Sequence, residues 1–264
     1  MADGDSEAFL SIREVSKTYR TLSKGTTVAL TPSSFDIGAH EFVSIVGPSG
    51  CGKSTLLNIL AGLLAPTTGE VVLESRPITG PDDRVGLVFQ RPVLLPWRKV
   101  IDNVTLPIEV KKLRPKQAYV DKAYQLLEMV GLKGFENAYP SELSGGMQQR
   151  ASIARTLVYD SRLLLMDEPF AALDAMTRDE MNVELLRIWR AQKMTIVFVT
   201  HNIPEAVMLS TKVIVMSARP GRVREIIPVE LGERGLDLTG NPEFGRIVSH
   251  IRGLLDQPER GAQP

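Results

Sequence analysis

The nine residues GPSGCGKST at positions 47–55 constrain the fold of this chain more than any other stretch. They fit the pattern G-x-x-x-x-G-K-[ST], with Gly47, Gly52, Lys53 and Ser54 at its fixed positions. The apolar run EFVSIVG (41–47) precedes them, and KSTLLNILAGLL (53–64) follows with helical spacing. A strand, a glycine-rich loop and a helix in this order predict a phosphate-binding loop at a helix N-terminus. The alternative is a tight turn with a surface lysine, which the flanking strand and helix disfavour.

The residue types in this loop suit nucleotide phosphates. Glycines let backbone N–H groups curl around a β-phosphate. Lys53 is expected to reach the β- and γ-phosphates, and the Ser54 hydroxyl is expected to bind Mg²⁺. Cys51 is expected to act as a spacer, through its backbone more than its thiol.

A second candidate element is LLLMDEP at 163–169, an apolar strand that ends in two acids. Ligands gather at the carboxyl ends of parallel strands. Asp167 is therefore expected to hold Mg²⁺, mainly through its water shell, and Glu168 to polarise an attacking water. Such acids also cap following helices, so the pair indicates a catalytic site only together with the phosphate loop.

The remaining pattern predicts an α/β fold around a mostly parallel sheet. Nearly continuous apolar runs, typical of strands buried on both faces, occur at 84–89, 162–167, 195–200 and 212–217, and 28–37 alternates. Residues 92–156 are expected to form a helical insert, with a helix over 115–132. Beyond residue 231 a short extension (232–264) is expected to hold one helix near 243–255 and to end in disorder at QPERGAQP.

Composition excludes several classes of protein. The net charge of zero gives no broad attraction to nucleic acid, and the single cysteine excludes an internal disulfide. No apolar run approaches the roughly 20 residues that span a bilayer. The acidic start of the chain differs from a signal peptide, so we expect a cytoplasmic protein unless another protein holds it at a membrane.

The stretch LSGGMQQR at 143–150 places two glycines at the start of a helical pattern, where each costs roughly 1 kcal/mol relative to alanine. Together with the two motifs above, with Gln90 after GLVFQ, and with FAALDA (170–175) and THNIPEA (200–206), it resembles the nucleotide-binding subunit of an ATP-binding cassette (ABC) transporter. The similarity runs from about Phe9 to Glu230. It implies a P-loop NTPase core, an antiparallel β subdomain and a helical insert, within an ATP-binding domain over 1–231.

The resemblance assigns roles to residues that would otherwise have ordinary structural interpretations. Tyr19 matches the aromatic residue on which adenine stacks, although alone it would be a packed strand residue. Gln90 matches the residue that touches Mg²⁺ or the attacking water. His201 matches the group that contacts the γ-phosphate and orients Glu168. The implied ATP-binding set is Tyr19, Gly47, Pro48, Ser49, Gly50, Cys51, Gly52, Lys53, Ser54, Thr55, Gln90, Asp167, Glu168 and His201; of these Lys53, Gln90, Glu168 and His201 are catalytic, and Ser54, Gln90 and Asp167 hold the metal.

The family works as head-to-tail pairs, so the resemblance implies that a second copy of the chain completes each site. Ser144, Gly145, Gly146, Gln148 and Asp174 are then expected to act on ATP bound by the partner. Met147 stands where the commonest family form has glutamine and cannot close a capping box with Ser144.

Further runs at 91–104, 177–189 and 215–223 resemble importers of the nitrate, sulfonate and taurine group. This implies two transmembrane permease subunits, indirectly a periplasmic or lipoprotein solute-binding protein, no nucleic acid, and a peripheral place on the cytoplasmic face of the inner membrane. Trp97 is expected as a buried aromatic inside the insert, as part of the groove that receives the permease, or as both. The alternatives are an exporter or lipid-trafficking cassette, and a soluble ABC protein acting on DNA or the ribosome.

Overall fold

The computed structural model describes residues 8–256 apart from 22–24, 160, 172, 233, 236, 237 and 239. The chain divides into two compact units. The first unit comprises the chain up to Asp82 and again from Lys193, and the second comprises Asp83–Gln192. The expected disordered end, 257–264, lies outside the described residues, and the boundary near 231 stays a prediction.

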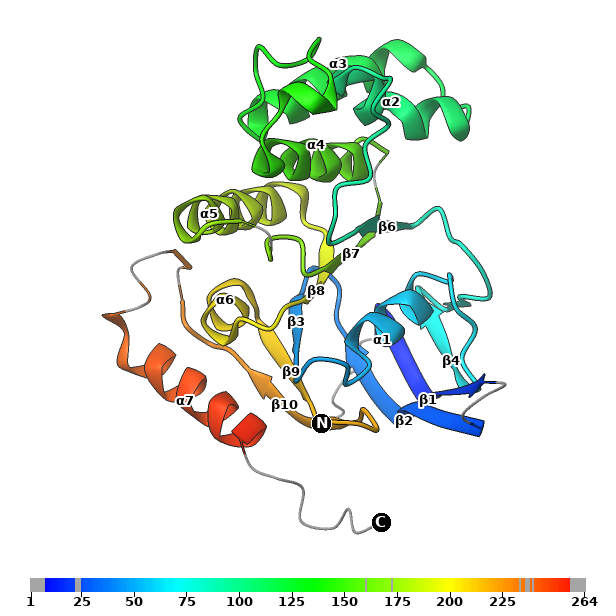
Figure 1. The fold of residues 1–264 in the computed structure, drawn as a ribbon, viewed down its shortest axis with the longest axis vertical. Coiled ribbons are helices and arrows are strands. Elements are labelled where there is room, and N and C mark those ends of the chain that lie inside the picture. The colour runs from blue at the N-terminus through cyan, green and yellow to red at the C-terminus, as the bar shows by residue number, and fades with distance from the viewer. Residues whose placement is uncertain are drawn as a thin grey trace, which may run out of the picture. The chain divides into compact units, whose positions relative to one another are not determined.

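An antiparallel sheet in the first unit contains β1 (Leu10–Thr21), β2 (Gly25–Ile37), β4 (Thr68–Leu73) and β5 (Arg76–Pro77). Its strand order is β2-β1-β4-β5 (Figure 1). Side chains of β2 alternate between buried and exposed along its second half, as expected for a strand with one solvated face. The predicted strand over 28–37 and the predicted antiparallel subdomain are thereby confirmed.

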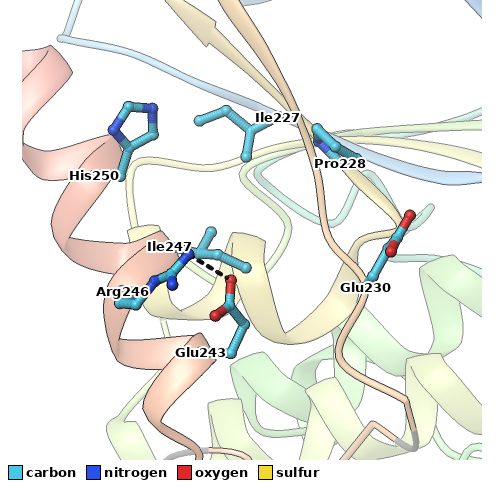
Figure 2. Close-up of a pocket in the computed structure, with 7 residues that line it drawn as sticks. All are labelled: Ile227, Pro228, Glu230, Glu243, Arg246, Ile247 and His250. Atoms are coloured by element: carbon cyan, nitrogen blue, oxygen red, sulfur yellow. Dashed lines mark hydrogen bonds and ion pairs between the residues drawn. The ribbon is translucent and has the colours of Figure 1, made fainter.

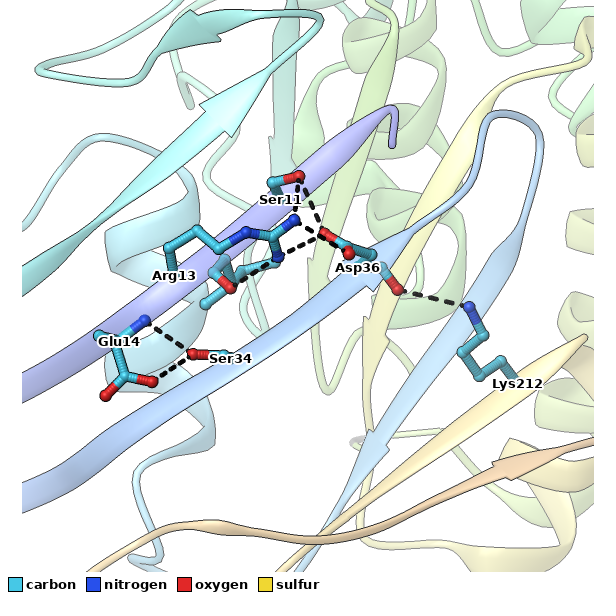
Figure 3. Close-up of polar contacts among 7 residues, drawn as sticks. Ser11, Arg13, Glu14, Ser34, Asp36 and Lys212 are labelled. Carbon is cyan, nitrogen blue, oxygen red and sulfur yellow. Dashed lines mark hydrogen bonds and ion pairs between the residues drawn. The ribbon is translucent and has the colours of Figure 1, made fainter. Parts of the chain in front are cut away.

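An ion pair bridges β1 and β2 on this sheet. Arg13 donates from Nη1 and Nη2 to the two carboxylate oxygens of Asp36, at 2.6 and 3.0 Å, and the Ser11 hydroxyl donates to Oδ1 at 2.9 Å (Figure 3). These hydrogen bonds from Arg13, with a smaller contribution from Ser11, lower the pKa of the Asp36 carboxyl.

The first unit also carries parallel strands. The strand β3 (Phe42–Val46) pairs in parallel with β8 (Thr195–Val199) and β9 (Lys212–Met216), and β10 (Val223–Pro228) pairs antiparallel with β9. Every residue of β3 and β8 is buried, which for β8 confirms the expectation drawn from its apolar run. Two helices follow these strands: α1 (Lys53–Leu60) after β3, and α6 (Ile203–Leu209) after β8. The helix expected over 53–64 is shorter because Gly62 takes φ +69.

The helix expected near 243–255 is present as α7 (Pro242–Asp256), which packs on α6 and β9 (Figure 1). Its apolar side chains Phe244, Ile247, Val248 and Ile251 are buried. A hollow of about 700 Å³ lies beside α7 and is lined by Ile227, Pro228, Glu230, Glu243, Arg246, Ile247 and His250 (Figure 2). None of these residues belongs to the predicted nucleotide site.

The second unit pairs β6 (Val85–Val88) in parallel with β7 (Leu163–Asp167). Its helices are α2 (Val100–Val110), α3 (Lys116–Met129), α4 (Gly145–Leu157) and α5 (Ala175–Gln192), with the 3₁₀ turn η1 (Pro140–Glu142) before α4. The helix expected over 115–132 is confirmed, and it begins after Pro115, which caps it. Over residues 8–256, with the gaps given above, no helix is long and apolar enough to cross a membrane.

Candidate nucleotide-binding site

The loop at 47–55 joins β3 to α1 and brings its lysine inside the fold. Lys53 is 6% exposed, and its Nζ donates to the carbonyl oxygens of Gly47 at 2.8 Å and Pro48 at 3.1 Å. A buried ammonium bound to carbonyl dipoles is well placed to exchange them for phosphate oxygens, which carry full charge.

Glycine is required in this loop for two different reasons. Gly50 and Gly52 have φ values of +74 and +99, a region that other residues rarely adopt. At Gly47 the constraint is space, because a Cβ there would lie 2.8 Å from Sγ of Cys51 and 2.9 Å from the carbonyl oxygen of Met216. The Cys51 side chain is fully buried, and burial raises the pKa of its thiol. The Cys51 sulfur thus fills the space beside Gly47, and the prediction that Cys51 matters mainly through its backbone stays a prediction.

Tyr19 lies within reach of the same loop. Its hydroxyl is 3.4 Å from the hydroxyl of Thr55, in the first turn of α1, and Lys17 Nζ lies 5.5 Å from the centre of its ring. The residue is 38% exposed, so the ring is not a buried strand residue. An exposed ring beside a phosphate loop can stack on a base.

His201 follows β8 in a turn held by a buried carboxylate. The Thr200 hydroxyl donates to Oε2 of Glu205 at 2.5 Å, and it accepts from the backbone N–H of Asn202 at 3.0 Å. The Asn202 side chain in turn caps α6 by accepting from the N–H of Glu205 at 3.1 Å. Glu205 is 6% exposed. The motif at 200–206 predicted a role for His201 alone, so the sequence did not indicate this buried carboxylate.

In the second unit, Asp167 and Glu168 stand at the end of β7, as expected. The chain changes direction between them, because Glu168 adopts φ +44, which is uncommon for a residue with a Cβ. The side chains of Asp167 and Glu168 therefore point in different directions, as a metal ligand and a general base would need. Strained backbone of this kind is frequent at functional sites.

Gln90 is exposed just after β6, and the structure links this position to α4. Gln149, only 2% exposed, donates from Nε2 to the carbonyl oxygen of Phe89 at 3.2 Å. Gln149 in α4 thus holds the end of β6, next to the exposed Gln90. This contact was not predicted, because it joins residues that are far apart in the chain.

The signature stretch begins α4 as a capped helix. Ser144 is the N-cap and accepts from the N–H of Met147 at 3.3 Å. The two glycines differ in surroundings: a Cβ on Gly146 would lie 3.2 Å from Thr177 Cγ2, whereas a Cβ on Gly145 would meet no described atom within 4 Å. Nothing in the described part of this chain therefore requires glycine at position 145.

Two predicted contacts to the partner's ATP have other tasks within the chain. Gln148 donates from Nε2 to the carbonyl oxygens of Pro140 at 2.9 Å and Leu143 at 3.3 Å. Asp174 accepts from the N–H of Thr177 at 3.0 Å and from its hydroxyl at 2.7 Å, which lowers the pKa of Asp174. The predicted roles of both residues towards a second subunit stay predictions.

The donor set expected for Mg²⁺ is composed of oxygen atoms. It comprises a hydroxyl on exposed Ser54, a carboxylate on half-buried Asp167 and an amide on exposed Gln90. Mg²⁺ prefers such hard oxygen ligands and keeps part of its water shell, which exposed donors permit. The residue types therefore fit the metal.

The chain matches known proteins over most of its length. A family model described as ABC transporter matches residues 30–171. The chain is 52% identical over 227 residues to a Methanocaldococcus jannaschii protein named an uncharacterized ABC transporter ATP-binding protein, covering 86% of this chain and 84% of that one. It is 45% identical to an aliphatic sulfonates import ATP-binding protein of Bacillus cereus, with 84% and 86% covered. It is 40% identical to a taurine import ATP-binding protein of a Jannaschia species, with 93% of each covered.

Solved structures agree with these relatives. A bacterial ABC transporter cassette solved as a dimer superimposes with a TM-score of 0.74 at 34% identity, covering 84% of this chain and 99% of that one. A second structure, with a TM-score of 0.72 at 33% identity and the same coverage, is a dimeric post-hydrolysis state of such a cassette bound to ADP and phosphate. The phosphate loop on β3, the acids on β7 and the signature on α4 thus occur in a chain that belongs to the ABC transporter family of ATP-binding proteins.

Proposed function

We propose that this chain is the ATP-hydrolysing subunit of an importer for a small anion of the sulfonate or taurine type. The observation that carries the ATPase part is the buried Lys53 bound to the carbonyls of Gly47 and Pro48, inside a loop of positive-φ glycines. The import direction and the substrate class rest on the names of the relatives from Bacillus cereus and Jannaschia.

In the proposed reaction the loop amides and Lys53 hold the β- and γ-phosphates, while Tyr19 stacks on the adenine. Ser54, Asp167 and Gln90 would hold Mg²⁺, which supplies charge neutralisation at the phosphate oxygens. Glu168 accepts a proton from the attacking water. His201 contacts the γ-phosphate and orients Glu168.

Two copies of the chain form the working unit in this proposal. Ser144 and the N–H groups of Gly145 and Gly146 approach the γ-phosphate bound by the partner, where the dipole of α4 favours negative charge. The exposed Ser144 and the open space at Gly145 support this arrangement. Loss of the γ-phosphate on hydrolysis removes these contacts and biases the pair towards its open state.

In this proposal the chain lies on the cytoplasmic face of the membrane and binds two transmembrane permease subunits, to which a solute-binding protein delivers the anion. Trp97 supports a protein contact in the second unit, because it is 71% exposed and is not the buried aromatic of the alternative interpretation. Large exposed aromatic side chains are frequent anchors of protein interfaces.

The substitution Glu168→Gln tests this function. The variant should bind ATP, dimerise in its presence and hydrolyse it at least about a hundredfold more slowly, since general base catalysis contributes roughly 10²–10⁴. Glu180→Gln, at an exposed position of α5, is the matched control and should hydrolyse ATP normally. Normal hydrolysis by Glu168→Gln would remove Glu168 from the mechanism. Mass spectrometry of the ligand carried by the cognate solute-binding protein then tests the anion class.

A further inference from the structure

The turn between β9 and β10 packs against the carbonyl groups of the phosphate loop. Arg219 in this turn donates from Nε to the carbonyl oxygen of Gly50 at 2.7 Å. Two residues later, Gly221 lies so close to the loop that a Cβ on it would be 1.8 Å from the carbonyl oxygen of Cys51. Two consecutive carbonyls of the phosphate loop therefore face the same turn.

The turn itself is fixed to β2 by backbone hydrogen bonds. The N–H of Gly221 donates to the carbonyl oxygen of Ala29 at 3.1 Å, and its carbonyl accepts from the N–H of Thr31 at 2.8 Å. The Ala29 oxygen also lies 2.8 Å from where a Cβ on Gly52 would stand. The phosphate loop is thus backed by β2 through main-chain atoms, and by the turn through the Arg219 side chain and the main chain of Gly221.

The contacts to the carbonyl oxygens of Gly50 and Cys51 also fix the direction of the N–H group that follows each carbonyl in the chain. In a trans peptide the carbonyl and the N–H of the next residue point in opposite directions. A Gly50 carbonyl that faces Arg219 directs the N–H of Cys51 away from the turn, and this N–H donates to the carbonyl oxygen of Pro48 at 3.2 Å, across the loop. By the same geometry, a Cys51 carbonyl that faces Gly221 directs the N–H of Gly52 away from it.

We propose that Arg219 and Gly221 are positioning residues of the nucleotide site. By holding the carbonyls of Gly50 and Cys51, they keep the loop closed through the Cys51 N–H and keep the N–H of Gly52 directed at the phosphates of the nucleotide. The inference rests on the proposed function, because it takes nucleotide phosphates as the ligand of this loop. It adds an element some 170 residues away in the chain to the binding machinery.

Titration of the full chain with Mg-ATP and Mg-ADP tests the role of Arg219. Arg219→Ala should weaken both nucleotides by about tenfold, the effect of losing one hydrogen bond from a charged group. Arg219→Lys should restore part of the affinity, since an ammonium can still donate to the Gly50 carbonyl. KM for ATP should rise more than kcat falls, and the thermal midpoint without nucleotide should stay near wild type, which a purely structural role would not allow. Arg76→Ala, at an exposed arginine of β5, is the control for loss of charge.

Gly221→Ala provides an independent variant, because its Cβ must displace either the turn or the Cys51 carbonyl. It should weaken both nucleotides more than Arg219→Ala does, whereas Gly245→Ala in α7, where a Cβ meets no described atom within 4 Å, should not. If Gly221→Ala fails to fold, the arginine variants decide. Equal affinities of Arg219→Ala and Arg76→Ala for both nucleotides would overturn the inference. A wild-type chain that binds neither nucleotide would instead contradict the proposed function.

Discussion

The hydroxyl of Tyr19 lies 3.4 Å from that of Thr55, so the C-terminal end of β1 meets the first turn of α1 beside the phosphate loop. The contact joins the antiparallel sheet to the helix that carries Lys53. The Tyr19 ring is therefore partly exposed, while its hydroxyl contacts Thr55.

We expect Tyr19→Ala to weaken ATP binding by about tenfold, because stacking on an aromatic ring contributes roughly 1–3 kcal/mol per base in nucleic-acid complexes. Tyr19→Phe should bind nearly as well as wild type, since it loses only the long contact to Thr55. Calorimetric titration with ATP measures both variants. A Phe variant as weak as the Ala variant would show that the hydroxyl, not the ring, makes the contribution.

At Gly145 the sequence accepts a poor helix former where the described chain leaves open space. Gly145→Ala should therefore leave the free energy of unfolding unchanged or slightly higher, because alanine favours helices by up to about 1 kcal/mol. Gly145→Asp should also bind ATP as a monomer, yet abolish hydrolysis, since its carboxylate repels the partner's γ-phosphate. Urea unfolding, ATP titration and phosphate release measure the three quantities. Normal hydrolysis by Gly145→Asp contradicts the proposed role of this residue.

The buried carboxylate of Glu205 should influence catalysis through the turn that carries His201. Glu205→Ala removes the acceptor of the Thr200 hydroxyl and should lower kcat roughly ten- to a hundredfold, as misplacement of a catalytic group by about 1 Å does. KM for ATP should change little, because no part of this turn belongs to the phosphate loop. Glu205→Gln keeps an acceptor oxygen and should recover most of the activity. If the Gln and Ala variants are equally slow, the hydrogen bond to Thr200 is not the cause.

Trp97 is presented by a loop that Asn103 holds from inside α2. The Asn103 side chain, fully buried, accepts from the N–H of Leu95 at 2.7 Å and donates to the carbonyls of Leu95, Arg98 and Lys99, each at 3.1 Å. Trp97→Ala should weaken association with the permease by about 30-fold, the effect of losing an interface anchor. The ATPase activity of the isolated subunit should not change. Tyr124→Ala, on exposed α3, is the control in the same pull-down.

The ion pair between Arg13 and Asp36 predicts a small dependence of stability on pH. The pKa of Asp36 is lower in the folded protein than in the unfolded chain, so its carboxylate stabilises the fold at neutral pH. This contribution is lost as the pH falls through the native pKa of Asp36. Asp36→Asn should therefore lower the thermal midpoint slightly at pH 7, and by less at about pH 3, below the usual pKa of an aspartate in an unfolded chain.

The effect should be small and weaker in high salt, because the side chains of Arg13 and Asp36 are 47% and 48% exposed. Asp179→Asn, at an exposed position of α5, controls for the loss of one charge. A midpoint difference that is the same at both pH values would show that Asp36 acts through packing and not through its charge.

Strands with long apolar runs were predictable from the sequence, and β1 was not. The strands β3, β8 and β9 are short, buried and continuous in apolar residues. In β1 the alternation is interrupted where Glu14 takes φ +49, and its register against β2 shifts between Ile12 and Lys17. A bulged strand loses the two-residue period on which such a prediction depends.

The candidate site likewise combines motifs that were predictable from the sequence with contacts that were not. Its motifs were found because each lies within a few consecutive residues, where spacing and residue type carry the signal. Arg219 supports Gly50 from 169 positions away, and Ala29 supports the same loop through its carbonyl oxygen alone. Contacts that end on main-chain carbonyls across such separations leave no residue pattern to read.

The open space at Gly145 also bears on how this protein should be engineered. Optimisation of the isolated chain for thermostability would favour alanine there, since the substitution removes a flexible residue and meets no obstacle in the described structure. If Gly145 serves the second subunit, the gain in thermostability would appear in every assay on the monomer, whereas the assembled transporter would lose its turnover. Stability screens on this cassette should therefore be run on the assembled, ATP-bound pair.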